Sequence, residues 1–176
     1  MTGVTVVRTY LEQRARPGSV RPVDHDPAVR TVRVIAADVA LFRRLYGEVG
    51  GPYHWQDRNT LSDDALHAHF ASPDVQLWVL YYADAPAGFF ELQRHADRSV
   101  EIAYFGLVPA FFGRGLGKRL LTEAVAAAWD LGADRVWLHT CTLDSPAALP
   151  NYLARGFEPF KTETYETTVV PSGAGA

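Results

Sequence analysis

The sequence predicts an α/β fold in which a mixed, mostly antiparallel sheet carries helices on both faces. Strand-like and helix-like apolar patterns alternate along the chain. The strand-like runs at residues 75–82, 87–94 and 98–108 are joined by tight turns, which favour antiparallel neighbours. The chain has 176 residues, of which 48% are hydrophobic, enough for one core. We therefore expect a single domain over residues 1–170 and a flexible tail at residues 171–176.

The first part of the chain predicts two strands and two helices. Residues 37–49 carry apolar side chains at helical spacing, and Gly50, Gly51 and Pro52 stop that helix. Ser62 is placed to cap a second helix. In order, we expect a strand at 4–14, a loop at 17–27, a strand at 32–35, a helix at 37–49, a loop at 53–60 and a helix at 63–71.

The second part predicts the centre of the sheet and two more helices. Gly106 lies inside a strand, where a glycine indicates a bulge or a close backbone approach. Gly132 supplies a C-terminal stop, and Pro150 is unusual within a helix. In order, we expect strands at 75–82, 87–94 and 98–108, a helix at 115–131, a strand at 135–140, a helix at 146–155 and a strand at 163–169.

Composition narrows the function classes and the cell compartment. The net charge is −3 and no long basic run is present, which disfavours nucleic acid as the main partner. No signal peptide opens the sequence and no apolar run reaches membrane-spanning length. The one cysteine, Cys141, has no internal partner for a disulfide, so we expect a cytoplasmic protein. We expect no metal site, and a homodimer is left open.

A glycine-rich segment between a strand and a helix is the strongest functional signal. The apolar run at 102–108 stops at Pro109, and Gly113, Gly115 and Gly117 precede a long helical pattern. Glycines at a helix N-terminus allow close backbone approach and leave free N–H groups aimed at a ligand. The helix dipole adds partial positive charge there. The segment is therefore expected to bind a phosphate or pyrophosphate.

Two common phosphate-binding motifs fit this segment poorly. A P-loop requires a glycine where Phe112 stands and a hydroxyl residue where Arg119 stands. A dinucleotide fingerprint requires a third glycine where Lys118 stands, and Asp134 precedes the next strand instead of ending it. A helix that begins at a glycine-rich turn and binds nothing is the remaining alternative.

The stretch from Glu101 to Phe157 resembles the GNAT superfamily of acyl-CoA-dependent N-acetyltransferases. Phe112 and Ser145 depart from that family's usual Gln or Arg and usual Asn, respectively. The family's loop, which follows a Val-x-Pro strand end, is matched by Val108, Pro109, Gly115, Leu116 and Gly117. A second family motif, Ala-x-x-x-Tyr-x-x-x-Gly-Phe, is matched by Ala148, Tyr152, Gly156 and Phe157.

The resemblance implies transfer of an acetyl group from the cosubstrate acetyl-CoA to a primary amine of a small molecule or peptide, by direct attack in a ternary complex. It implies that a bulge splays two strands and lets the pantetheine arm pass between them. A non-catalytic acyl-CoA-binding sensor, another acyl donor and an oxygen acceptor are alternatives. The residues expected to bind acetyl-CoA are Leu107, Val108, Gly113, Arg114, Gly115, Leu116, Gly117 and Lys118.

Two residues are expected to move protons in this reaction. An alkyl amine has a pKa near ~10 and must lose a proton before it attacks. Glu101 stands where some family members carry a catalytic glutamate, and burial among apolar neighbours would raise its pKa towards that of a useful base. Ordered water is the alternative acceptor. Tyr152 begins the second motif, and the resemblance makes it the acid that protonates the departing thiolate.

Other polar residues suggest weaker hypotheses. Cys141 and His139 are two apart in an extended segment, which allows an acyl-enzyme, although a small core cysteine is more common. The loop with Tyr53, Trp55 and Arg58 is the expected acceptor-binding segment. Asp57 beside it would attract an ammonium group, and Arg58 a carboxylate or phosphate, unless the two pair with each other. If this loop is structural, the acceptor pocket is expected around Glu91, Tyr104 and His139.

Overall fold

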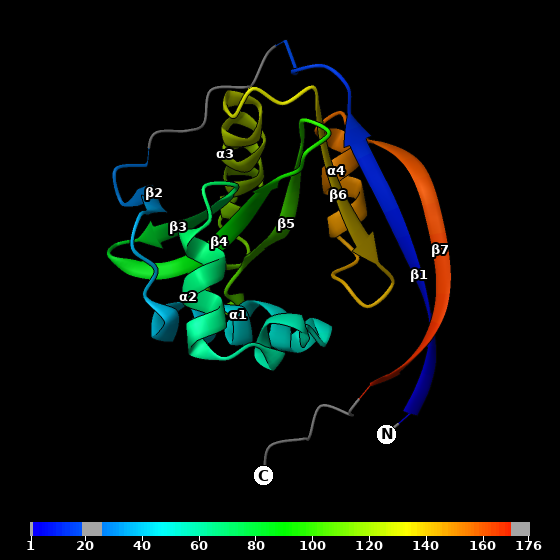
Figure 1. Ribbon diagram of the computed structural model, residues 1–176, viewed down its shortest axis with the longest axis horizontal. Helices are drawn as coiled ribbons and strands as arrows, with labels where there is room; N and C mark the ends of the chain where they lie inside the picture. Colours follow the sequence, from blue (N-terminus) through cyan, green and yellow to red (C-terminus); the bar gives the residue numbers. More distant parts are fainter. Residues whose placement is uncertain (1, 19–25, 170–176) are drawn as a thin grey trace.

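The computed structural model describes residues 2–18 and 26–169 and contains a seven-stranded sheet flanked by helices (Figure 1). The expected tail at 171–176 and most of the loop at 17–27 lie outside the described residues. The elements are β1 (Thr2–Gln13), β2 (Val29–Val34), α1 (Val39–Gly50), η1 (Gly51–Tyr53), η2 (Asp57–Thr60), α2 (Asp63–Ala71), β3 (Val75–Tyr82), β4 (Ala85–Arg94), β5 (Ser99–Leu107), η3 (Pro109–Phe111), α3 (Leu116–Asp130), β6 (Arg135–Cys141), α4 (Ala148–Ala154) and β7 (Glu158–Val169).

The strand order β2-β3-β4-β5-β6-β1-β7 confirms the mixed, mostly antiparallel sheet. Among the strand pairs of the described residues, only β5 and β6 run parallel. Their pairing is short: Ser99, Val100 and Glu101 of β5 pair with Arg135, Val136 and Trp137 of β6, and no later residues pair. Both strands continue beyond this point, so the sheet opens between them towards their C-terminal ends.

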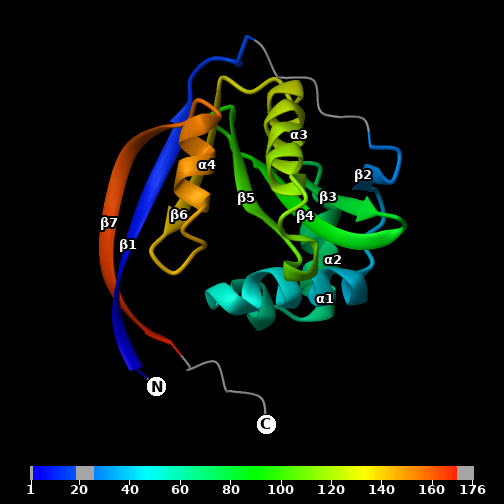
Figure 2. The same cartoon turned by 180° about the vertical axis from the view of Figure 1, so that it is seen from behind.

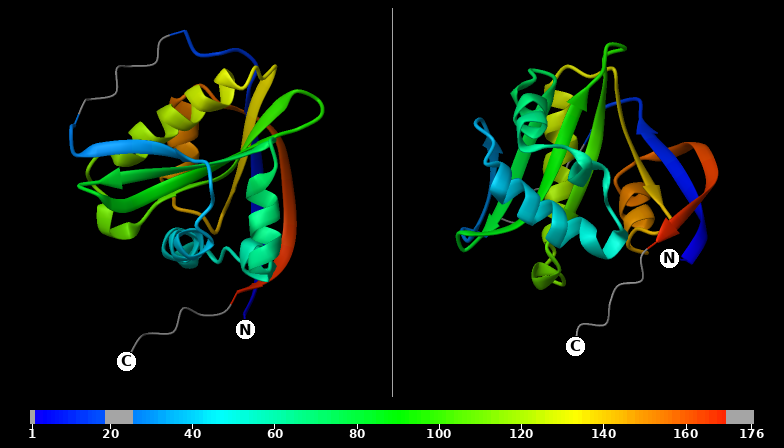
Figure 3. Two further views of the ribbon diagram at one scale, coloured as in Figure 1. Left: turned by 60° about the vertical axis from the view of Figure 1, so that its left-hand side comes forward. Right: turned by 60° about the horizontal axis from the view of Figure 1, so that its bottom comes forward.

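Helices cover both faces of the sheet, as expected (Figure 2). The larger core packs α3 and α4 against one face, with Leu120, Ala124 and Phe157 among its buried members. The smaller core packs α1 and α2 against β3, β4 and β5 on the other face. In the part of the chain described, no helix covers β6, β1 and β7 on that second face (Figure 3).

The helix N-termini differ in how they are capped. The Asp38 side chain accepts a hydrogen bond from the Leu41 N–H at the start of α1, and the Ser62 side chain accepts one from the Ala65 N–H at the start of α2. The cap predicted at Ser62 is therefore confirmed. Helix α3 instead begins after Gly115, which has φ 74° and provides no capping side chain. Its first-turn N–H groups are thus left for another acceptor.

The bulge expected at Gly106 lies elsewhere. The register between β4 and β5 shifts between Glu91 and Leu92, which face Tyr104 and Ile102, so the extra residue is Ala103. Gly106 instead allows α1 to approach, because a Cβ added there would lie 2.4 Å from Val49 Cγ1. Glycine in a strand signals a bulge or a close approach equally well. Here the second cause applies, and the close neighbour is a side chain.

The segment expected as a loop at 53–60 contains the two 3₁₀ turns η1 and η2. Between them Trp55 folds back over the end of α1, so that a Cβ added at Gly50 would lie 2.3 Å from its ring. Trp55 also packs edge-on against Tyr104 of β5, with ring centroids 5.1 Å apart. The segment is therefore anchored to the second core. In α4, Pro150 occupies the third helical position, where its missing N–H has no intrahelical partner to lose.

Candidate active site

A cavity of about 1010 Å³ opens where β5 and β6 diverge. Its wall is formed by the glycine-rich loop, α4, the segment between α1 and α2, and the strands β1, β5, β6 and β7. The predicted site residues on this wall are Tyr53, Trp55, Leu107, Gly113, Gly115, Leu116, Gly117, Lys118 and Tyr152. The predicted residues Arg58, Glu101, Val108 and Arg114 are not on it.

The glycine-rich loop has the geometry of an anion cradle. Gly113 and Gly115 adopt φ 78° and 74°, and a Cβ at either position would meet no protein atom within 4 Å. The backbone is therefore open to the cavity. The uncapped first turn of α3 adds free N–H groups and the positive end of the helix dipole. These features fit the pyrophosphate of coenzyme A.

Two predicted cosubstrate residues lie behind the loop. Val108 is 8% exposed and belongs to the second core, where its N–H donates to the Ala87 carbonyl. The guanidinium carbon of Arg114 lies 4.9 Å from the centroid of the Tyr82 ring, on the side of β3. Neither residue lines the cavity, so contact of either one with acetyl-CoA stays a prediction.

Tyr152 has the environment of a proton donor. Its ring is 7% exposed and packs edge-on against Phe105 and Phe157, which fixes its direction. Among the described residues, none forms a hydrogen bond with its hydroxyl, and Tyr152 lines the cavity. Burial, with a smaller contribution from Asp144, raises the pKa of the Tyr152 hydroxyl. At neutral pH the group is protonated and free to donate into the cavity.

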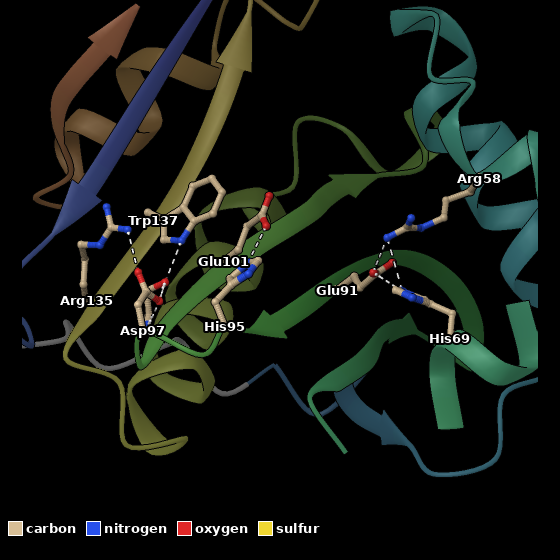
Figure 4. Close-up of polar contacts among 9 residues, drawn as sticks. Arg58, His69, Glu91, His95, Asp97, Glu101, Arg135 and Trp137 are labelled. Atoms are coloured by element: carbon tan, nitrogen blue, oxygen red, sulfur yellow. Dashed lines mark hydrogen bonds and ion pairs between the residues drawn. The ribbon is translucent and has the colours of Figure 1, made fainter. Parts of the chain in front are cut away.

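Glu101 is engaged outside the cavity wall. One carboxylate oxygen lies 2.9 Å from His95 Nε2, in a cluster that also contains Trp137 (Figure 4). Burial raises the pKa of the Glu101 carboxyl, and His95 partly offsets that effect. The direction of this pKa agrees with the role of a base, but the carboxylate lies off the cavity wall where an amine would bind.

His139 lies on the wall, two residues after Trp137, the last residue of β6 that pairs with β5. Its side chain is on the same face of the strand as that of Trp137. Burial lowers the pKa of the His139 imidazole, and the positive charge of Arg8 lowers it further. Within the described residues its ring nitrogens form no hydrogen bond, and its ring contacts Tyr10 at a centroid distance of 5.6 Å. A neutral imidazole with free nitrogens therefore faces the cavity.

Cys141 also lines the cavity, but its chemistry is unfavourable for an acyl-enzyme. Burial raises the pKa of the Cys141 thiol, and Asp144 raises it further. Only the thiolate is a good nucleophile, so this environment disfavours covalent catalysis. His139 and Cys141 both line the cavity, as their spacing predicts, but the thiol of Cys141 stays protonated.

Arg58 is held by the protein itself. Its guanidinium donates to the buried Glu91 carboxylate at 2.6 Å, and His69 Nε2 lies 2.6 Å from the same oxygen (Figure 4). The side chains of Arg58 and Glu91 are 17% and 0% exposed. The guanidinium also lies over the Tyr104 ring at 4.9 Å. The expectation that Arg58 binds an acceptor anion is not met by this arrangement, because a buried carboxylate already neutralises it.

Sequence reasoning missed the cavity-lining residues contributed by β1 and β7. Arg8 and Tyr165 lie on the wall, with the Arg8 Nη2 atom 3.2 Å from the Tyr165 hydroxyl. Neither residue stands in a motif. Alternation along the strand could have assigned them to one face, but only the pairing of β1 with β6 brings that face to the cavity. Asp57 lines the cavity as well and accepts a hydrogen bond from the Tyr104 hydroxyl at 3.1 Å.

Two features are absent from the described residues. No group of three or more His, Cys, Asp or Glu side chains there is arranged to hold a metal ion. No helix there combines the length and the apolar character needed to cross a membrane.

The match to a known protein family spans both the glycine-rich loop and the motif that contains Tyr152. The acetyltransferase (GNAT) family matches residues 41–157. A mycothiol acetyltransferase of Corynebacterium efficiens is 32% identical over 111 residues. That alignment covers 60% of this chain and 36% of the relative, so the chain corresponds to about a third of that protein.

Several solved structures share the fold at lower identity. An aminoglycoside acetyltransferase from an uncultured soil metagenomic sample, in complex with sisomicin, is 14% identical with a TM-score of 0.63, covering 74% of this chain and 88% of the other. A GCN5-related N-acetyltransferase from Kribbella flavida is 20% identical with a TM-score of 0.63, covering 91% and 56%. A Bacillus subtilis acetyltransferase in complex with CoA is 22% identical with a TM-score of 0.56, covering 74% and 76%.

Proposed function

Because the chain belongs to the acetyltransferase (GNAT) family, we propose that it transfers an acetyl group from acetyl-CoA to a primary amine, by direct attack in a ternary complex. One observation carries the proposal: the uncapped N-terminus of α3, the gap between β5 and β6, and the Tyr152 hydroxyl all border one cavity. The relatives' names support acetyl transfer and an amine acceptor as the class of reaction.

The cosubstrate supplies the activated acetyl thioester. The backbone of Gly113–Lys118 would hold its pyrophosphate, and the gap beyond Glu101 and Trp137 would admit its pantetheine arm. This arrangement would bring the thioester towards Tyr152, whose raised pKa keeps the hydroxyl protonated until a thiolate departs. After Glu101, β5 has no strand partner on the side of β6, so amide groups there would be available to the carbonyl oxygen, as an oxyanion site requires.

We further propose that His139 accepts the proton of the incoming amine. A general base must lie within hydrogen-bond reach of that proton. His139 lines the cavity and its nitrogens are free, whereas Glu101 lies outside the wall and binds His95. The lowered pKa of His139 leaves the imidazole neutral, and therefore able to accept a proton, at neutral pH.

A pH profile separates the two bases. For His139, kcat/KM should rise with pH to a plateau, with a midpoint below the ordinary histidine value of about 6.5. His139→Gln should abolish this limb and reduce the rate by about 10²-fold or more, while Glu101→Gln keeps it. A profile that survives in His139→Gln and disappears in Glu101→Gln would return the role to Glu101, the sequence-based prediction.

The reaction itself is tested by incubating the protein with acetyl-CoA and a panel of amines while free thiol is measured. Calorimetry should detect CoA binding by the wild type and loss of binding in Gly115→Val, because a side chain there enters the space reserved for phosphate. Gly132→Val, which has a similar φ of 76° but lies at the far end of α3, controls for backbone strain. Binding of acyl-CoA without turnover of any amine would support the alternative, a non-catalytic sensor.

A further inference from the structure

Arg8 lines the cavity and forms no ion pair with a described carboxylate. Arg14, just after the end of β1, pairs with Glu12, and Arg58 pairs with Glu91. Arg8 is only partly exposed and lines the cavity, so its charge faces a space that a ligand can enter.

The nearest carboxylates are committed elsewhere. Glu163 is the register partner of Arg8 on β7, yet its side chain accepts from the Tyr10 hydroxyl at 2.8 Å and pairs with Lys161 at 2.6 Å. Asp144, on the cavity wall, accepts from the Thr140 hydroxyl at 2.7 Å and from the Cys141 N–H at 2.8 Å. Both acids are therefore held by neutral groups or by another cation.

The Arg8 guanidinium is also held in position. It donates to the Tyr165 hydroxyl at 3.2 Å and lies over the Tyr165 ring at 5.0 Å. Its Nε atom is buried and has no hydrogen-bond partner. A cation fixed in advance loses little conformational freedom when it binds, and guanidinium groups pair well with carboxylate and phosphate oxygens. An anionic oxygen group would also accept hydrogen bonds from guanidinium N–H groups of Arg8 that have no partner among the described residues.

His139 lies within electrostatic reach of this cation and of Asp57. Arg8 lowers the pKa of His139, and Asp144 and Asp57 raise it, which means that charges of both signs act on the imidazole. Arg8 and Asp57 come from different elements, β1 and η2, and both line the cavity. The wall around the imidazole thus offers groups of both charges, which suits a molecule that carries a positive and a negative end.

We propose that Arg8, supported by Tyr165, is an anion subsite of the acceptor pocket, so that the acceptor is an amine that also carries a carboxylate or phosphate group. This inference rests on the proposed function in one respect: the molecule bound there is taken to be the acetyl acceptor. The anion occupies Arg8, and the ammonium end lies towards Asp57 and His139, where its proton is removed.

The test uses the imidazole of His139 as a reporter of charge at Arg8. Nuclear magnetic resonance follows its signal, assigned with His139→Gln, in the wild type saturated with CoA so that the glycine-rich loop is occupied. Acetate, inorganic phosphate and the uncharged analogue acetamide are titrated at constant ionic strength. Acetate or phosphate should shift the signal saturably and raise the pKa of His139, and acetamide should not. The stronger of the two anions identifies the group as carboxylate or phosphate.

Variants of Arg8 test whether the anion-induced shift of the His139 signal depends on this residue. Arg8→Gln should weaken anion binding about tenfold or more, Arg8→Lys should retain most of it, and the control Arg14→Gln should match the wild type. CoA affinity should be the same in all three variants. An anion response that persists in Arg8→Gln, an equal response to acetamide, or a loss of CoA affinity in Arg8→Gln overturns the subsite. Failure of the wild type to bind CoA instead overturns the proposed function, and the anion titration without CoA still decides the role of Arg8.

Discussion

Arg58 and Arg8 lie close to the same cavity but in opposite surroundings. Arg58 bridges η2 and β4, with its side chain 17% exposed and its guanidinium paired with the fully buried Glu91. Arg8 lies on the open side formed by β1 and β7, lines the cavity and has no acidic partner among the described residues. The first arginine is part of the protein's own packing, and the second is available to a ligand.

The difference shows that the partner and the burial of an arginine decide its role. A buried charge must be paired, because desolvation of an unpaired ion is costly. Arg58 meets this requirement internally and thereby holds η2 against β4, which leaves Asp57 and Trp55 facing the cavity. Arg8 keeps partial contact with water and needs no internal carboxylate. Arg58 therefore belongs to a region that positions other residues, and Arg8 to a region that is open to a ligand.

The largest effect is expected from breaking the buried ion pair between Arg58 and Glu91. Glu91→Gln removes the carboxylate that pairs with Arg58, and the cation is then left in a buried site with His69. The free energy of unfolding should fall by about 3–5 kcal/mol, measured by urea denaturation. The matched control is Asp84→Asn, which breaks the exposed pair with Arg30 and should change stability by less than about 1 kcal/mol. Equal effects of the two variants would contradict the distinction.

A substitution on the cavity wall should reduce activity and leave stability unchanged. Tyr152→Phe removes a hydroxyl that bonds to no described residue and leaves the packing of the ring on Phe105 and Phe157 unchanged. Turnover should decrease by about 10²-fold because the leaving thiolate loses its proton donor. The melting temperature and the affinity for acetyl-CoA should stay as in the wild type. Unchanged turnover with chemistry as the slow step would remove the acid role from Tyr152.

Trp55 belongs to both regions, because it packs on the second core and also lines the cavity. Gly50→Ala places a Cβ 2.3 Å from the Trp55 ring, so the ring or α1 must move. We expect a loss of about 1–3 kcal/mol of stability, with a raised acceptor KM. Gly47→Ala on the same helix meets no atom within 4 Å and should stabilise by about 0.5–1 kcal/mol instead. A destabilised Gly50→Ala protein with normal acceptor KM would make Trp55 purely structural.

The smallest effect is expected at the exposed acid. Asp57→Asn keeps an oxygen for the Tyr104 hydroxyl but removes the charge that would attract an ammonium group. A partly screened charge of this kind contributes up to about 1 kcal/mol, so the acceptor KM should rise by no more than about fivefold. The KM for acetyl-CoA should not change. A large decrease in kcat would show that Asp57 takes part in chemistry rather than in attraction.

The sequence predicted those parts of the molecule that depend on local patterns. The bounds of β3 and α2 and the cap at Ser62 agree with the structure because each follows from neighbouring residues. The glycine-rich loop lies at the cavity because strand, glycines and helix form one contiguous motif. The placement of Tyr152 was predicted from a motif that fixes it relative to Gly156 and Phe157, which also places it at the cavity.

Features that depend on distant pairing could not be predicted. The bulge at Ala103 becomes visible only through the register of β5 against β4. The sequence gives Arg58 and Glu91 no shared motif, although a buried ion pair joins them. Arg14 pairs with Glu12, two residues away, whereas the surroundings of Arg8 depend on β6 and β7, which pair with β1 on either side.

The position of β1 has a consequence for how the protein is made. This strand lies between β6 and β7, so its partners are far away along the chain, as in the hydrogen bond from Thr5 to Glu166, which are separated by 161 residues. Such contacts close large loops and form slowly. During synthesis, β1 therefore has no strand partner on either edge until β6 and β7 have been made. During that interval it is exposed to pairing with other chains, and the Arg8 wall of the cavity is among the last parts to form.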